Sequence, residues 1–85
     1  MASRIAVVAI IIENPEAVGK INEYLHEVSD YIIGRMGIPY RDRKVHIISI
    51  AIDAPQDVIS ALSGKIGRLS GVSAKIAYSN IISEE

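Results

Sequence analysis

The side chains best suited to acid–base or metal chemistry in this 85-residue sequence are its two histidines, His26 and His46. A closed zinc or nickel site needs about four ligands at suitable spacing, and here no cysteine and no further spaced ligand accompanies the imidazoles. No nucleophile elbow is present, and no serine–histidine–acid set can be assembled. We therefore expect surface or boundary histidines, no metal site, no cofactor, no catalytic residue and no enzymatic activity.

The most unusual segment is residues 34–40, Gly-Arg-Met-Gly-Ile-Pro-Tyr. Glycine inside a strand often marks a bulge or a close approach of backbones. The guanidinium of Arg35 beside these glycines could bind a carboxylate or a phosphate. Alternatively, the glycines only bend the strand and Arg35 pairs with an acidic residue of a partner subunit. Arg35 and Gly37 are candidate ligand-binding residues, and both interpretations stay open.

A second glycine-rich segment, residues 61–71, places Gly64 and Gly67 inside a predicted helix. Each glycine costs a helix about 1 kcal/mol relative to alanine. The segment lacks the GxxxxGK[ST] pattern of a phosphate-binding loop, so close packing against a neighbouring element is the preferred explanation. The basic stretch at residues 41–44 is interpreted as a solvated hairpin turn.

Four strands and two helices must position these side chains. Runs rich in β-branched residues predict strands over residues 5–12, 31–40, 45–52 and 72–78. Asn14 suits a helix N-cap and Pro15 the first helical position, while residues 53–57 open the second helix. The inward stripes are expected at Val18, Ile21, Leu25 and Val28 in the first helix, and at Val58, Leu62, Ile66 and Leu69 in the second.

The two halves of the chain resemble each other at an offset of about 40 residues, as expected of a doubled β-α-β unit. The matching pairs are Ile10 with Ile50, Ile12 with Ile52, Pro15 with Pro55 and Val18 with Val58. The pattern predicts one α+β domain over residues 1–85, a ferredoxin-like βαββαβ sandwich. Its four-stranded antiparallel sheet should have the order 4-1-3-2, with both helices on one face.

Strand alternation assigns side chains to the two faces of this sheet. The side chains expected under the helices are even-numbered: Val8, Ile10, Ile12, Ile32, Met36, Ile48, Ile50, Ile52, Val72 and Ile76. The opposite face should carry Ile5, Val7, Ile11, Val45 and Ile47, with Arg35 and Lys75 at its margin. An apolar centre with a charged margin is typical of an association surface. The five apolar residues and Lys75 are therefore predicted to form the interface of a homo-oligomer, either a dimer or a tetramer.

Composition narrows the class of protein further. Nine basic and ten acidic side chains give a net charge of −1, which argues against binding nucleic acid mainly through its phosphates. At 49% hydrophobic residues, a chain of this size can bury one small core. The apolar run over residues 5–12 is too short to span a bilayer and has no signal-peptide cleavage site. We expect a cytoplasmic protein with no membrane partner.

Residues 34–40, the following Arg41-Asp42-Arg43, and residues 61–67 with Ser70-Gly71-Val72 resemble the small iron-only hydrogenase system regulators. The resemblance covers nearly the whole chain. These stand-alone domains are similar to ACT domains and to the C-terminal domain of the nickel-responsive repressor. The resemblance implies a ferredoxin-like, oligomeric regulatory domain associated with hydrogenase genes. Nickel sensing is not implied, because the chain lacks cysteine and the repressor's N-terminal ribbon-helix-helix.

In ACT domains, effectors commonly bind near the first strand–helix turn at a subunit interface. By resemblance, this makes Glu13, Asn14 and Pro15 candidate ligand-binding residues, although the usual glycine of that turn is missing here.

The sequence as a whole favours a transcriptional regulatory domain that senses a small-molecule effector or binds a protein partner, without a DNA-binding element of its own. The alternative is a small enzyme of the same fold, such as an acylphosphatase-like hydrolase. That activity requires a phosphate-cradling loop with an arginine after the first strand, where this chain has Glu13-Asn14-Pro15.

Overall fold

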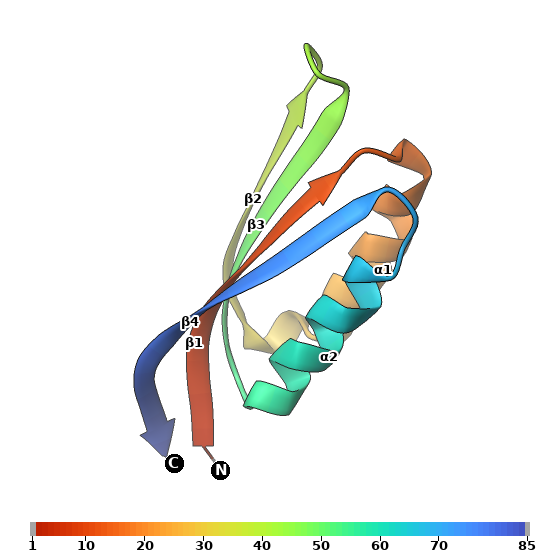
Figure 1. The fold of residues 1–85 in the computed structure, drawn as a ribbon. Helices are drawn as coiled ribbons and strands as arrows, with labels where there is room; N and C mark the ends of the chain where they lie inside the picture. The colour runs from red at the N-terminus through yellow and green to blue at the C-terminus, as the bar shows by residue number, and fades with distance from the viewer. Residues whose placement is uncertain (1, 85) are drawn as a thin grey trace.

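A four-stranded antiparallel sheet with two helices on one face makes up the fold (Figure 1). The computed structural model describes the backbone of residues 2–84 and the side chains of residues 2–80. The strands are β1 (Ala2–Ile12), β2 (Ile32–Tyr40), β3 (Val45–Ala54) and β4 (Val72–Glu84), and the helices are α1 (Val18–Glu27) and α2 (Gln56–Gly67). Short 3-10 helices, η1 (Pro15–Ala17) and η2 (Ser29–Tyr31), flank α1. The strand order β2-β3-β1-β4 confirms the predicted ferredoxin-like α+β fold.

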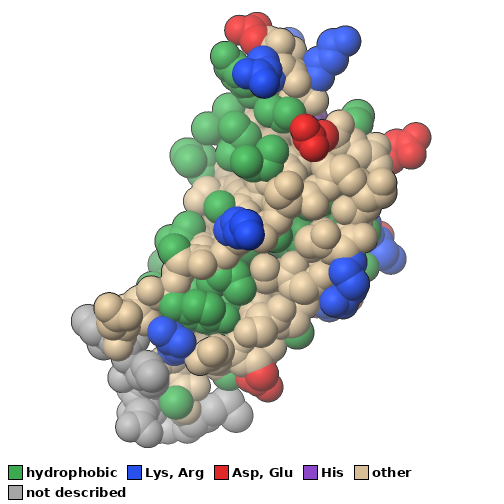
Figure 2. Space-filling view, in the orientation of Figure 1, with side chains coloured by type: hydrophobic (Ala, Val, Ile, Leu, Met, Phe, Trp, Pro, Cys, Tyr) green, Lys and Arg blue, Asp and Glu red, His purple; other side chains and the backbone are tan. Residues whose placement is uncertain are grey.

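The hairpin of β2 and β3 projects beyond the end of α1 and makes the molecule elongated, with extents of 43 × 19 × 17 Å (Figure 1). Figure 2 shows that the tip of this hairpin carries both basic and acidic side chains. Neither helix in the described part of the chain is long and apolar enough to cross a membrane.

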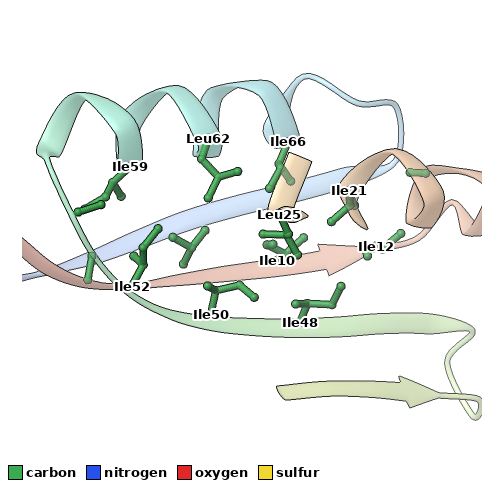
Figure 3. Close-up of a cluster of buried hydrophobic side chains, with 14 residues drawn as sticks. Ile10, Ile12, Ile21, Leu25, Ile48, Ile50, Ile52, Ile59, Leu62 and Ile66 are labelled. Carbon is green, nitrogen blue, oxygen red and sulfur yellow. The ribbon is translucent and has the colours of Figure 1, made fainter. Parts of the chain in front are cut away.

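The core lies between the helices and the two central strands, as Figure 3 shows. Alternate residues of β1 point into the core, and the residues of β3 and β4 that pair with them lie on the same face of the sheet. Val8, for example, pairs with both Ile50 and Ile76. The fully buried large side chains are Val8, Ile10, Ile12, Ile21, Leu25, Ile50, Ile52, Ile59, Leu62 and Ile66. This confirms the alternation predicted for β1 and β3. On α2 the buried stripe begins at Ile59, and Val58 is only half-buried.

Strand β2 contributes no fully buried side chain, because a bulge near its beginning reverses the faces of the residues that follow. Its register against β3 shifts between Ile32 and Gly34, so that Arg35 lies opposite Ile50 and Met36 opposite Ser49. Directly paired residues share a face, and one extra residue therefore moves every later side chain to the other side. The predictions that Met36 is buried under the helices and that Arg35 lies on the opposite face are both wrong: Met36 is 56% exposed, and Arg35 faces α1.

Close packing does not explain the glycines of α2, contrary to the sequence-based interpretation. A Cβ atom at Gly67 would lie 3.9 Å from the Ala74 side chain, an ordinary contact. At Gly64 it would meet only Nη1 of the flexible Arg68 side chain, at 3.3 Å. Within the described chain, neither glycine is required for a close approach of backbones.

Gly19, in the first turn of α1, is expected to be a position where alanine stabilises the protein. A Cβ atom there would meet nothing within 4 Å, so only the helix-forming tendency changes. The substitution Gly19→Ala should raise the free energy of unfolding by about 0.5–1 kcal/mol. Urea denaturation of both proteins at one concentration measures this, and a lower midpoint for the alanine variant would contradict it.

Candidate functional site

Three hollows follow one another along the side of α1 that faces the β2–β3 hairpin. The first is lined by Asn22, Leu25, His26, Ser29, Ile32 and Arg35. The second is lined by Val18, Asn22, Arg35, Gly37, Ile38, Pro39, His46, Ile47 and Ile48. The third, of about 330 Å³, is lined by Pro15, Pro39, Tyr40, Arg41, Lys44, Val45 and His46. Neighbouring hollows share residues, Asn22 and Arg35 in the first case and Pro39 and His46 in the second, and the three together are here called the α1–β2 groove.

Arg35 and Asn22 meet where the first two hollows join. Nη2 of Arg35 donates a hydrogen bond to Oδ1 of Asn22 over 2.9 Å. Arg35 forms no ion pair within the described part of the chain, so its charge is met only by a neutral amide. The bulge in β2 creates this contact, because it turns Arg35 toward α1.

Gly37 keeps the middle of the groove open. It lies two residues beyond Arg35 on the same face of β2, opposite Ile48. A Cβ atom built on Gly37 would meet nothing within 4 Å. The structure thus brings the predicted ligand-binding residues Arg35 and Gly37 together in one groove.

The charged residues that line the groove are all basic. Arg35, Arg41 and Lys44 contribute to its walls together with His26 and His46, whereas no aspartate or glutamate lines any of the three hollows. The two ion pairs of the described residues, Lys20–Glu23 and Lys65–Glu27, lie outside it. In a chain with a net charge of −1, this groove is a local concentration of positive charge.

The predicted site residues Glu13 and Asn14 are held by the turn that precedes β4. The amide of Glu13 donates to the carbonyl of Gly71 over 2.7 Å. Asn14 caps η1 by accepting from the amide of Glu16 at 3.2 Å, and its Nδ2 donates to the carbonyl of Ser70. Neither Glu13 nor Asn14 lines the groove; Pro15 does. Their roles as ligand-binding residues remain predictions.

Asn22 and His46 are groove residues that sequence reasoning did not assign to a ligand site. Asn22 is one of several polar residues on the outer side of α1, and nothing in its spacing distinguishes it. His46 lies opposite Pro39 and Ile12 in the sheet, which places it on the helix side, close to the hairpin turn. Only the folded hairpin shows that it lines the same groove as Arg35.

The face of the sheet turned away from the helices, here called the open face, is apolar and exposed. Ile5, Val7 and Ile11 of β1 are 48%, 41% and 47% exposed. The bulge adds three exposed β2 residues to them, Met36, Ile38 and Tyr40. Val45 and Ile47 are half-buried beside them, and Lys75 lies opposite Ala9 at the β4 margin. Figure 2 shows hydrophobic side chains gathered on this side of the molecule, with basic side chains between them.

Asp53 is an acidic residue on the open face, since it lies directly opposite Ile5. Its Oδ1 atom is buried and accepts no hydrogen bond from the described residues. A buried carboxylate oxygen without a donor is rare and requires an explanation. The predicted interface residues therefore share one face with an acidic residue whose buried oxygen has no donor among the described residues; that they form an interface remains a prediction.

A second polar cluster, around Arg4, joins the beginning of β1 to α2 and β4. Arg4 donates from Nη1 to Gln56 and from Nη2 to the carbonyl of Ser79, and its guanidinium lies 4.4 Å from the centre of the Tyr78 ring. The Tyr78 hydroxyl in turn is 3.1 Å from the Ser60 hydroxyl. Nε of Arg4 is buried without a partner among the described residues, but the other polar groups are engaged with one another, and the cluster joins the beginning of β1 to α2 and β4.

The described residues contain no group of three or more histidine, cysteine, aspartate or glutamate side chains that could hold a metal ion. His26 lines the first hollow of the groove and His46 the second and third.

The element order, the strand order and the helices on one face define an ACT-like member of the ferredoxin-like α+β class. Within this class, residues 4–76 match the model of the TM1266-like family, described provisionally as an iron-only hydrogenase system regulator. The match covers most of the chain, and the protein belongs to this family.

Among the solved structures that resemble the chain are the following two. The uncharacterized protein TM1266 from Thermotoga maritima is 35% identical, with a TM-score of 0.85 over 89% of this chain and 96% of that one. A formyltetrahydrofolate deformylase from Pseudomonas putida KT2440 is 12% identical, with a TM-score of 0.66, and the match covers 91% of this chain and 29% of the deformylase. The second likeness is one of fold alone. No curated protein matches the chain at a significant level.

Proposed function

We propose that this protein is a non-enzymatic regulatory domain of the iron-only hydrogenase system that works as a homo-oligomer, with the open faces of two copies packed together. The observation that carries the proposal is the exposed apolar centre of the open face, formed by Ile5, Val7 and Ile11. Leaving this surface in water forgoes about 25 cal/mol for each Å² of apolar area that a partner would cover. The family description supports a regulatory role.

Charge complementarity supports a second copy as the occupant of this face. Asp53 lies on β3 opposite Ile5, and Lys75 lies on β4 opposite Ala9, so the two charges stand on either side of β1. Val7 is midway between them. A twofold axis that lies between the two sheets and passes Val7 brings Asp53 of one copy to the partner's Lys75, and the reverse pair forms by symmetry.

The rival hydrolase function receives less support from the turn after β1. An acylphosphatase-like loop needs an arginine and free amides there to hold a phosphate. Here the amide of Glu13 is bonded to Gly71, and the side chain of Asn14 is bonded to the Glu16 amide and the Ser70 carbonyl. The arginine that could hold a phosphate, Arg35, lies on β2 and not in the turn after β1. Its Nη2 donates a hydrogen bond to Oδ1 of Asn22.

Light scattering of the purified protein tests the oligomer. We expect a mass of two or four times the 9.2 kDa of one chain at micromolar concentration. The substitution Val7→Asp places a carboxylate at the centre of the contact, so it should give monomers or aggregates. The control Glu23→Ala changes an exposed residue of α1 and should leave the mass unchanged. A mass of 9.2 kDa for the unmutated protein would overturn the proposal.

A charge exchange tests the arrangement within the oligomer. Asp53→Lys and Lys75→Asp should each weaken association by about tenfold, since each places like charges together. The double variant restores opposite charges and should recover most of the affinity, a coupling that sedimentation equilibrium measures. If the two effects simply add, Asp53 and Lys75 are not partners across the interface.

A further inference from the structure

The guanidinium of Arg35 is oriented but not neutralised. A guanidinium has five N–H donors, and Asn22 Oδ1 accepts from only one of its nitrogens. The Nδ2 group of Asn22 donates to no atom of the described residues, so two amide donors remain beside the charge. This combination suits an oxyanion, because arginine binds carboxylates and phosphates through parallel hydrogen bonds.

The groove offers space next to this donor set. Gly37, on the same side of β2, leaves the floor open, since a side chain there would meet no atom within 4 Å. Further along, Pro39 and Pro15 provide an apolar wall. An anion on Arg35 can therefore carry an apolar body that extends toward the hairpin.

Electrostatics favour the same ligand at the far end of the groove. Arg41 and Lys44 line the third hollow, and neither forms an ion pair with a described residue. No carboxylate lines the groove, so nothing there repels an anion or competes with it. The positive field attracts anions before contact and strengthens their binding.

We propose that the α1–β2 groove is the effector site of this protein and binds an anionic small molecule, with its phosphate or carboxylate on Arg35 and Asn22 and its apolar part against Pro39 and Pro15. The inference rests on the proposed regulatory function for its biological meaning. The two anion donors, Arg35 and Asn22, lie on the helix side of the sheet, so binding by them is separate from the contact between open faces.

NMR titration of the unmutated, isotope-labelled protein with phenyl phosphate, inorganic phosphate and succinate tests the site at constant ionic strength. We expect saturable shifts confined to the amides of the groove, including Arg35, Gly37 and His46. Phenyl phosphate should bind about tenfold more tightly than inorganic phosphate, because its ring covers apolar wall. If succinate binds more tightly than inorganic phosphate, the effector is assigned as a carboxylate. If inorganic phosphate binds more tightly, the effector is assigned as a phosphorylated molecule.

Two variants and one control make the test specific. Arg35→Gln should weaken binding of phenyl phosphate at least tenfold, and Gly37→Val should block it by filling the floor. Arg43→Gln removes the same charge from the hairpin turn outside the groove and should leave affinity within about twofold. If no probe gives saturable shifts, or if Arg43→Gln weakens binding as much as Arg35→Gln, the inference is overturned. Light scattering on the same samples reports the oligomer separately, so failure of the site and failure of the proposed function are distinguished.

Discussion

Replacing Gly71 by alanine is expected to lower the free energy of unfolding by about 2–5 kcal/mol, the sum of a backbone and a steric cost. The backbone cost arises because Gly71 has a φ of +74°, in the left-handed region that is unfavourable for a residue with a Cβ atom. The steric cost arises because the new Cβ would lie 2.7 Å from Cβ of Asn14 and 3.2 Å from its backbone nitrogen. The turn cannot easily retreat, since the Gly71 carbonyl accepts the 2.7 Å hydrogen bond from Glu13.

Urea denaturation measures the Gly71→Ala effect, with Gly19→Ala as the matched control of opposite sign. The steric part can be isolated by the second substitution Asn14→Gly, which removes the side chain that the new Cβ would touch. We expect the double variant to be less destabilised than the sum of the single variants. Additive effects would show that Asn14 does not limit the turn, and an unfolding midpoint equal to that of the parent would refute the strain at Gly71.

The part of this fold that could be predicted is the part in which buried and exposed side chains alternate along a strand without interruption. The register between β1 and β3 is continuous, so one choice of parity correctly assigned the paired part of each strand. In β2 the same rule failed after Ile32, because the bulge inserts one residue and reverses every later side chain. Gly34 and Gly37 indicated an irregular strand, but glycine alone does not give the position or the number of extra residues.

The candidate site depends on that irregularity and was therefore only half predictable. Arg35 and Gly37 could be singled out by residue type, because a guanidinium beside glycines is unusual in a strand. Their neighbours could not: Asn22, His46 and Pro15 come from α1, β3 and the turn after β1, and no periodicity links them to Arg35. Conversely, Asn14 was assigned by resemblance to ACT domains, whereas in this chain its side chain caps η1 and bonds the Ser70 carbonyl.

The second large effect on the free energy of unfolding is expected at Ile50 of β3, and its comparison with Met36 of β2 tests the reversal of faces in β2. Ile50 is fully buried at the centre of β3, between Val8 of β1 and the backbone of β2. The substitution Ile50→Ala should lower the free energy of unfolding by about 2–5 kcal/mol, since it removes buried methyl and methylene groups and leaves a cavity. Met36 is predicted by parity to occupy the same core, yet it is 56% exposed on the open face. Met36→Ala should therefore cost less than about 1 kcal/mol.

Chemical denaturation of the two variants and the parent at one protein concentration makes the comparison, because association adds to the apparent stability of the native state. The ratio of the two decreases in the free energy of unfolding shows whether β2 is bulged or regular. Equal losses of several kcal/mol would place Met36 under the helices, and with it Arg35 on the open face. In that case the hydrogen bond from Arg35 to Asn22 could not form, and the α1–β2 groove would lose its anion-binding side chain. A large loss for Ile50→Ala beside a small one for Met36→Ala thus supports both the bulge and the position of Arg35 in the groove.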